Sequence, residues 1–163
     1  MNDVAGTIND RQIISAARAE LAAGRPVALA SLLATSGSMP RHEGARMLAL
    51  ADGSFIGTVG GGNIEFIAQA REGELLAAAA DGKAAPASLE WMTHAKNDMA
   101  CGGDALLAVR LLTAEDEGWL SDIAAAAESG DAAWLVEDWS DAAAPAARVV
   151  SEDDGCDVPV WDE

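Results

Sequence analysis

Two glycine-rich turns hold most of the residues in this chain that could bind a ligand or do chemistry. The first lies at residues 58–65 and the second at residues 98–104, and each follows a predicted strand. Glycine lets the backbone approach a ligand closely, and a helix start offers unpaired N–H groups to an anion. We therefore expect both turns to line one pocket. The residues concerned are Gly60, Gly61 and Gly62 in the first turn, and Cys101, Gly102 and Gly103 in the second.

The triple glycine is a candidate phosphate cradle. The alternative is a tight strand-to-helix turn without a ligand, but three consecutive glycines exceed what such a turn needs. The turn is not a dinucleotide fingerprint, because Glu65 stands where that motif requires glycine, and it is not a P-loop, because no Gly-Lys-Ser/Thr follows. Glu65 falls in the first turn of the predicted helix. It either interacts favourably with the helix dipole or faces the pocket.

Cys101 is the candidate nucleophile or metal ligand. Nearby N–H dipoles or cations lower the pKa of a thiol and raise its reactivity, whereas most free cysteines are small buried hydrophobes. A polar, glycine-rich loop favours the functional thiol. Three alternatives stay open: a metal site made with His42 and His94, a Cys–His nucleophilic pair, and a disulfide with Cys156. No ligand pair has the usual zinc spacing.

Two arginines, Arg41 and Arg46, flank the sequence His42-Glu43-Gly44. Arginine binds phosphate in a bidentate manner, so this loop is a second candidate for anion binding. The alternative is an exposed loop with ordinary charges.

Hydrophobic spacing and turn residues predict the elements that position these groups. Residues 9–12 read as a capping box that opens a helix ending at Gly24. The Asp52-Gly53 pair predicts a hairpin turn. We expect strands at residues 27–35, 46–51, 54–59, 88–93 and 105–112, and a helix at residues 63–80.

The last fifty residues resemble the beginning of the chain in the order of their predicted elements. We predict a helix at residues 119–128 and strands at 133–137, 148–151 and 158–161. The order helix, strand, strand repeats that of residues 9–51, and a structural repeat is one interpretation. This C-terminal segment, residues 114–163, lacks both the triple glycine and the Cys-Gly-Gly sequence. It therefore resembles scaffold or half of an interface, not a second active site.

Composition and charge exclude several functions. The 163-residue chain has a net charge of −17, of which residues 1–113 contribute −3 and residues 114–163 contribute −14. Nucleic acid and anionic membranes both require a basic face, so neither is an expected partner. The longest apolar run, residues 27–34, is too short to span a membrane. With no visible targeting segment and only two cysteines, we expect a cytoplasmic protein.

Three ordered motifs resemble those of the xanthine dehydrogenase accessory family (XdhC/CoxI type), in its N-terminal domain. Residues 35–47 match the pattern T-x-G-S-x-P-R-x-x-G-x-[KR]-M, residues 60–65 match G-G-G-x-x-E, and residues 99–103 match M-x-C-G-G. With the flanking elements the resemblance covers residues 10–112. It implies a protein that binds the molybdenum cofactor, protects it during sulfuration and delivers it to a molybdenum hydroxylase. We expect no enzymatic turnover, because the three ligand-type loops contain no catalytic dyad of clear spacing.

The resemblance also implies the site residues and the partners. A cofactor phosphate would meet glycine amides and arginines, and the metal end would meet the cysteine. A molybdenum hydroxylase would be the client, with a cysteine desulfurase and a separate Rossmann-domain protein as further partners, and we expect a homo-oligomer. The implied site comprises Arg41, Arg46, Gly60, Gly61, Gly62, Asn63, Cys101, Gly102 and Gly103 for binding, with Cys101 and Glu65 as the reactive groups and Cys101 as the metal ligand.

The chain departs from the family pattern in two residues and in length. Asn63 stands where members often have cysteine, and Asp98 where they often have glycine. The family usually continues into a nucleotide-binding Rossmann domain, which we do not expect within these 163 residues. We expect an α/β fold: a mixed sheet with β-hairpins and packed helices over residues 1–113, and a short acidic lobe over residues 114–163. A small thiol enzyme acting on a phosphorylated metabolite and a non-binding regulatory subunit are the alternative functions.

Overall fold

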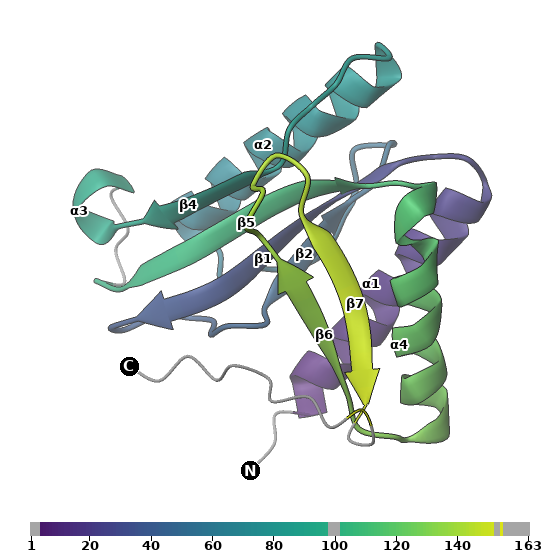
Figure 1. The fold of residues 1–163 in the computed structure, drawn as a ribbon. Coiled ribbons are helices and arrows are strands. Elements are labelled where there is room, and N and C mark those ends of the chain that lie inside the picture. Colours follow the sequence, from purple (N-terminus) through teal and green to yellow (C-terminus); the bar gives the residue numbers. More distant parts are fainter. Residues whose placement is uncertain (1–3, 98–101, 152–153, 155–163) are drawn as a thin grey trace.

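The protein is described by a computed structural model that covers residues 4–97, 102–151 and 154 (Figure 1). Its centre is a five-stranded antiparallel sheet with the strand order β3-β2-β1-β5-β4. The middle strand β1 pairs with both β2 and β5, and Ser36 at its end lies opposite Asp104 at the start of β5. The strands are β1 Val27–Ser36, β2 Arg46–Ala49, β3 Phe55–Gly57, β4 Ser88–Met92 and β5 Asp104–Leu112.

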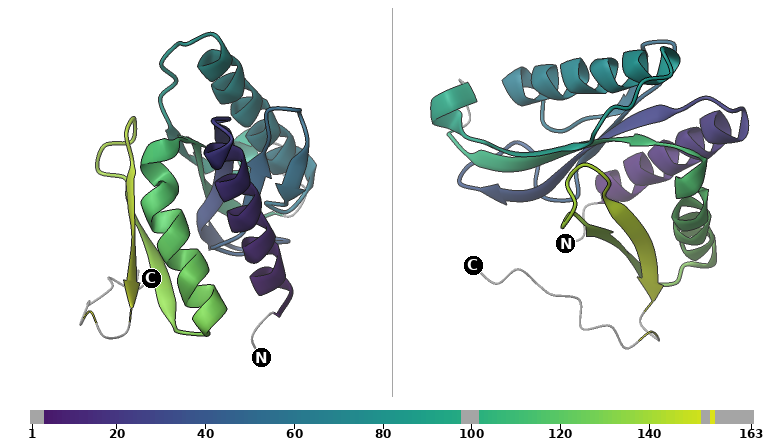
Figure 2. Two further views of the ribbon diagram at one scale, coloured as in Figure 1. Left: turned by 90° about the vertical axis from the view of Figure 1, so that its right-hand side faces the viewer. Right: turned by 45° about the horizontal axis from the view of Figure 1, so that its top comes forward.

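Helices cover both faces of this sheet, as Figure 2 shows. Helix α2 (Gly62–Ala80) lies across one face, while α1 (Val4–Ala22) and α4 (Glu117–Ser129) lie on the other. A hairpin of β6 (Ala133–Asp138) and β7 (Ala146–Ser151) forms a second sheet beside α4. Two short elements complete the described fold: α3 (His94–Asn97) follows β4, and the 3₁₀ turn η1 (Ala114–Asp116) follows β5.

The sheet separates two apolar cores. On β1, Ala28, Ala30 and Leu32 face α2, whereas Val27 and Leu29 face α1. Successive side chains of a strand alternate between faces, so a strand buried on both sides must be apolar at every position. This explains the continuous apolar run that predicted the strand. Within the described residues, no helix combines the length and the apolar character that crossing a membrane requires.

Most predicted elements are confirmed with small changes in their bounds. The predicted start of the first helix is wrong: α1 begins at Val4, and residues 9–12 lie inside it. Asn9, the N-cap of the predicted capping box, therefore lies inside the helix, and the carboxylate of the next residue, Asp10, lies 3.6 Å from the guanidinium of Arg46. The sequence did not predict α3 or η1. The strand predicted at residues 158–161 lies outside the described residues.

The α/β fold with packed helices and hairpins is confirmed, and the described sheets are antiparallel throughout, not mixed. The predicted boundary at residue 113 runs through a shared core, because Trp119 and Leu120 of α4 pack with Ile13 and Leu21 of α1. The repeated order of helix, strand and strand is present in the structure, since α1, β1 and β2 are followed later by α4, β6 and β7.

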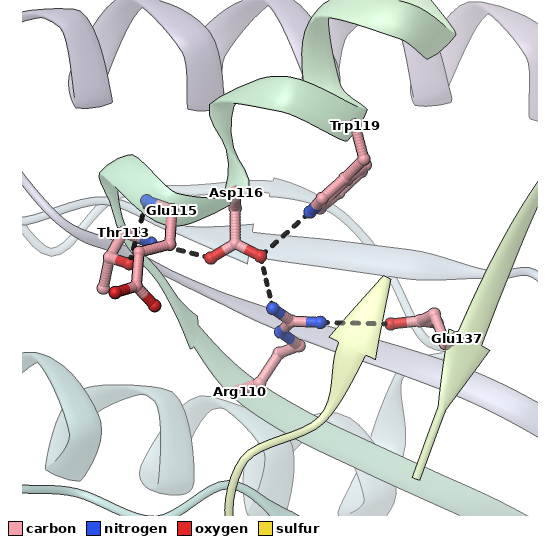
Figure 3. Close-up of polar contacts among 6 residues, drawn as sticks. All are labelled: Arg110, Thr113, Glu115, Asp116, Trp119 and Glu137. Atoms are coloured by element: carbon pink, nitrogen blue, oxygen red, sulfur yellow. Dashed lines mark hydrogen bonds and ion pairs between the residues drawn. The ribbon is translucent and has the colours of Figure 1, made fainter. Parts of the chain in front are cut away.

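A buried polar network ties the C-terminal elements to the sheet (Figure 3). Arg110 of β5 donates to Asp116, and its Nη1 lies 3.8 Å from Oε1 of Glu137 on β6. Asp116 also accepts from the indole N–H of Trp119 at 2.9 Å and from the backbone N–H of Thr113 at 3.0 Å. Burial raises the pKa of Glu137, and the charges of Arg46 and Arg110 oppose that rise. This network fixes η1 and the hairpin against β5.

Candidate functional site

The triple glycine turns the chain from β3 into α2 with an unusual backbone. Gly60, Gly61 and Gly62 have φ values of 121°, 74° and 60°, all in the region that disfavours other residues. Among the described residues, a β-carbon on Gly61 or Gly62 would meet no atom within 4 Å. The backbone conformation therefore explains these two glycines, and the space beside them is open.

Glu65 closes this turn from inside the helix. Its Oε2 accepts a hydrogen bond from the hydroxyl of Thr58 and another, 3.0 Å long, from the backbone N–H of Gly61. The Thr58 oxygen in turn accepts from the N–H of Gly60 at 3.1 Å. Because the Glu65 carboxylate already occupies the Gly61 amide, an anion would have to use the N–H groups of the first helical turn, beginning at Gly62.

The loop after β1 lies directly against the second glycine turn. The β-carbon position of Gly37 is 3.2 Å from Cα of Gly103, and a β-carbon on Gly103 would stand only 2.6 Å from the carbonyl oxygen of Ser38. Real β-carbons do not approach that closely, so residue 103 must be glycine for the two segments to pack. Close packing against the backbone therefore requires glycine at position 103, whereas backbone conformation requires it at positions 61 and 62.

The same loop also reaches the first glycine turn. The Cγ atom of Arg41 lies 3.6 Å from the β-carbon position of Gly60. Residues 36–41 therefore bridge the two turns, which the sheet alone would leave as separate connections. We call these three segments, residues 36–41, 58–65 and 102–103, the loop cluster.

The first turn of α2 meets the segment that leads to the cysteine. The side-chain amide of Asn63 donates to the backbone carbonyl of Asn97, the last residue of α3. Cys101 lies outside the described residues, as do Asp98, Met99 and Cys156. The structure describes both sides of that gap: Asn97 accepts a hydrogen bond from Asn63 of the loop cluster, and Gly102, a member of the cluster, lies beside Gly37.

Arg46 is not brought to the loop cluster. Its backbone carbonyl accepts from Thr58 at 3.0 Å, but its guanidinium lies on the α1 face of the sheet, opposite to α2. Alternation along β2 explains this, because Met47 faces α2 and its neighbour Arg46 must face the other way. The prediction that Arg46 lines the same site as the glycines is therefore not supported by its position.

The two histidines lie in exposed positions. His94 Nδ1 is 3.0 Å from Oδ1 of Asp104, and the His94 backbone N–H donates to the same oxygen at 2.9 Å. These hydrogen bonds lower the pKa of Asp104. Within the described part of the chain, His42 and His94 belong to no cluster of three potential metal ligands.

The sequence prediction missed residues that shape the site and the core beneath it. Thr58 and Asn97 act through hydrogen bonds that no motif indicates. Glu72 is a residue of α2 and lies on the buried face of that helix, where it is 0% exposed. The sequence did contain a signal for this burial. Ile64, Ala68 and Glu72 follow at intervals of four residues, so they must share one face of the helix.

Comparison with known proteins supports the resemblance. Residues 20–84 match the family model described as the XdhC and CoxI family, which includes the first two motifs; the third lies beyond the match. An uncharacterized protein of Escherichia coli strain K12, YqeB, is 52% identical over 40 residues, which are 24% of this chain and 7% of YqeB.

A solved structure shares the fold. The crystal structure of a xanthine dehydrogenase from Bacillus halodurans superposes with a TM-score of 0.66 at 17% sequence identity, over 85% of this chain and 42% of that one. Residues 1–113 alone could not account for that coverage, so the common fold reaches into the C-terminal elements. The chain spans less than half the length of both relatives. Over residues 20–84, the sequence of this chain matches the XdhC and CoxI family.

Proposed function

We propose that this chain is an accessory protein of a molybdenum hydroxylase related to xanthine dehydrogenase, and that it binds the molybdenum cofactor at the loop cluster and delivers it to that enzyme. The observation that carries the proposal is the contact of residues 36–41 with both glycine turns, at Gly60 and at Gly103. Residues 19 apart (Arg41 and Gly60) and 66 apart (Gly37 and Gly103) thereby come together, and they belong to the first two motifs and to the described end of the third.

The residues present fit a phosphorylated ligand with one restriction. Open space beside Gly61 and Gly62 would let a ligand approach the backbone. The Cβ and Cγ atoms of Arg41 lie beside Gly60, so its guanidinium could reach a phosphate bound there. The N–H groups of Gly62 and Asn63, at the start of α2, have no partner within the helix by its geometry. The restriction is Glu65, which takes the Gly61 amide and places a carboxylate nearby.

Each residue then has a defined task. Arg41 and the first N–H groups of α2 would bind the phosphate, and Glu65 would hold the turn in its binding conformation. Cys101, bonded directly to Gly102, would present a thiol to the metal end. When bound, the molybdenum cofactor supplies a metal centre coordinated by sulfur, on which the client enzyme depends. We further propose a cysteine desulfurase as the sulfur donor and cytoplasmic assembly.

Titration of the purified protein with molybdenum cofactor tests the proposal. We expect saturable binding that Gly61→Ala and Arg41→Ala weaken by about ten-fold or more. Gly61→Ala strains the turn, whose φ of 74° positions the first N–H groups of α2, and Arg41→Ala removes a charged phosphate contact. Gly53→Ala is the matched control for the first variant, since Gly53 has a φ of 83° and equally open surroundings in a distant hairpin turn. Arg18→Ala on the exposed side of α1 is the control for the second. Absence of binding by the wild type contradicts the proposal.

One observation favours a second candidate, a thiol-dependent enzyme acting on a phosphorylated metabolite. The pairing of His94 with Asp104 resembles the arrangement of a base and the carboxylate that orients it. Rapid alkylation of Cys101 at neutral pH, slowed by His94→Ala and by added phosphate compounds, would favour that enzyme over a cofactor carrier.

A further inference from the structure

Strand β4 forms one edge of the five-stranded sheet, and among the described residues only β5 pairs with it (Figure 1). The outer side of such a strand offers backbone N–H and C=O groups to another strand, and natural proteins usually protect it with lysine, proline or a bulge. Residues 88–92 contain neither lysine nor proline, and their pairing with β5 runs without a shift of register. This edge is therefore suited to the addition of a further strand.

The two faces of β4 differ in character. Met92 belongs to the core shared with α2, and Glu90 accepts a hydrogen bond from Arg71 of that helix. Because side chains alternate along a strand, Leu89 and Trp91 point to the opposite face. Leu89 is half-buried there and Trp91 is 49% exposed. An aromatic and an aliphatic side chain thus lie at an unpaired sheet edge.

The sequence of β4 is complementary to itself when two copies pair antiparallel about a twofold axis through residue 90. In that register, Leu89 lies opposite the partner's Trp91, and Trp91 lies opposite the partner's Leu89. Within its own chain, Trp91 already lies opposite Leu106 of β5. The indole would therefore have a leucine on each side, and the axis repeats this contact. Side-chain pairs across neighbouring strands are the contacts that stabilise a sheet.

The charges on the α2 face fit the same register. Two Glu90 carboxylates would lie opposite each other, which is unfavourable by itself. Each is bound by Arg71 of its own chain, so the axis would bring together two acids and two bases. A hollow of about 470 Å³, lined in part by Arg71, Leu89 and Glu90, leaves room for side chains of the partner. The edge also belongs to residues 1–113, which carry only −3 of the net charge of −17.

We propose that β4 is a self-association surface, at which two copies of this chain pair through antiparallel β4 strands centred on Glu90 and join their five-stranded sheets into one. A dimer of this kind is closed, because each copy uses the same surface. The inference is independent of the cofactor proposal, since β4 contains no residue of the loop cluster.

Sedimentation equilibrium of the full chain, in about 150 mM salt to screen the net charge, measures the association. We expect a reversible dimer. Trp91→Lys should raise its dissociation constant by about ten-fold or more, because the axis removes the apolar contact twice and an edge lysine opposes strand pairing. Phe66→Lys on α2, where the aromatic side chain is 69% exposed, is the matched control and should dimerise like the wild type.

Circular dichroism verifies that both lysine variants fold. A wild type that remains monomeric up to its solubility limit overturns the proposal. So does a folded Trp91→Lys protein that dimerises as tightly as the wild type.

Disulfide cross-linking tests the register. In a chain that carries Cys101→Ser and Cys156→Ser, Glu90→Cys should form a linked dimer on mild oxidation, because the axis passes through residue 90. Leu89→Cys is the matched control: the two copies of residue 89 would lie diagonally, about 7–8 Å apart, beyond the usual reach of a disulfide. Equal rates for the two variants, or no cross-link by Glu90→Cys, contradict the pairing.

The charge arrangement provides a second test of the same register. Arg71→Gln should weaken the dimer a few-fold, because it leaves the two Glu90 carboxylates facing each other without their cations, and adding Glu90→Gln should restore it. Failure of the second substitution to restore the dimer contradicts the register. Gly61→Ala should dimerise like the wild type whether or not the cofactor binds, so failure of one proposal can be told from failure of the other.

Discussion

Glu72 should make the protein progressively less stable as the pH rises, and its replacement by glutamine should remove that effect. Its side chain is 0% exposed on the buried side of α2, and among the described residues neither carboxylate oxygen has a hydrogen bond of standard geometry. Burial raises the pKa of Glu72 from 4.5 to about 8, and the charge of Glu65, two turns earlier on α2, acts in the same direction. The backbone of Ala30 and Ala49 lies close enough to oppose the rise in its pKa. The folded protein therefore binds this proton more tightly than the unfolded chain does.

The magnitude follows from the two pKa values. The stabilisation from the bound proton is fully present below pH 4.5 and is lost as the pH rises to about 8. At about 1.4 kcal/mol for each pKa unit, the free energy of unfolding should fall by about 4 kcal/mol between pH 5 and pH 9 through this residue alone. Between pH 7 and pH 9 the fall should be about 1.4 kcal/mol.

Urea unfolding at pH 5, 7 and 9, followed by circular dichroism, measures this effect. Other groups titrate equally in wild type and Glu72→Gln, so the difference between the two isolates the contribution of Glu72. That difference should shift by about 4 kcal/mol in favour of the glutamine variant over the range. Glu74→Gln, two residues away on the exposed side of α2, is the matched control and should follow the wild type. Parallel pH profiles for wild type and Glu72→Gln would refute the reasoning.

Three further changes test the packing around the site and the buried network. Arg110→Met should lower the free energy of unfolding by about 3–5 kcal/mol in urea, because it leaves two buried carboxylates without their cation; a loss under about 1 kcal/mol would contradict this. Gly103→Ala should lower the melting temperature more than Gly102→Ala, since only residue 103 would place its β-carbon 2.6 Å from a backbone oxygen. Thr58→Val should remove two hydrogen bonds, weaken stability by about 1–2 kcal/mol and speed hydrogen exchange of the Gly60 amide; unchanged exchange would argue against the turn geometry.

Local signals in the sequence predicted most elements of the fold. The apolar run of β1, the Asp52-Gly53 turn and the periodicity of α2 each act over a few residues, and each is confirmed. The start of α1 was wrong because a capping pattern can also occur inside a helix. Asp10, which belonged to that pattern, is paired with Arg46 across the structure instead.

The sequence by itself determined the family motifs, the types of element and the charge asymmetry, because these are properties of neighbouring residues. Only the tertiary structure decided that Gly37 and Gly103 meet, that Glu65 occupies the Gly61 amide, and that Arg41 lies beside Gly60 while the Arg46 guanidinium lies on the α1 face of the sheet. The reason is physical. Such contacts depend on strand register, on side-chain alternation and on the absence of a β-carbon where two backbones cross, and these are set by segments far apart in the chain.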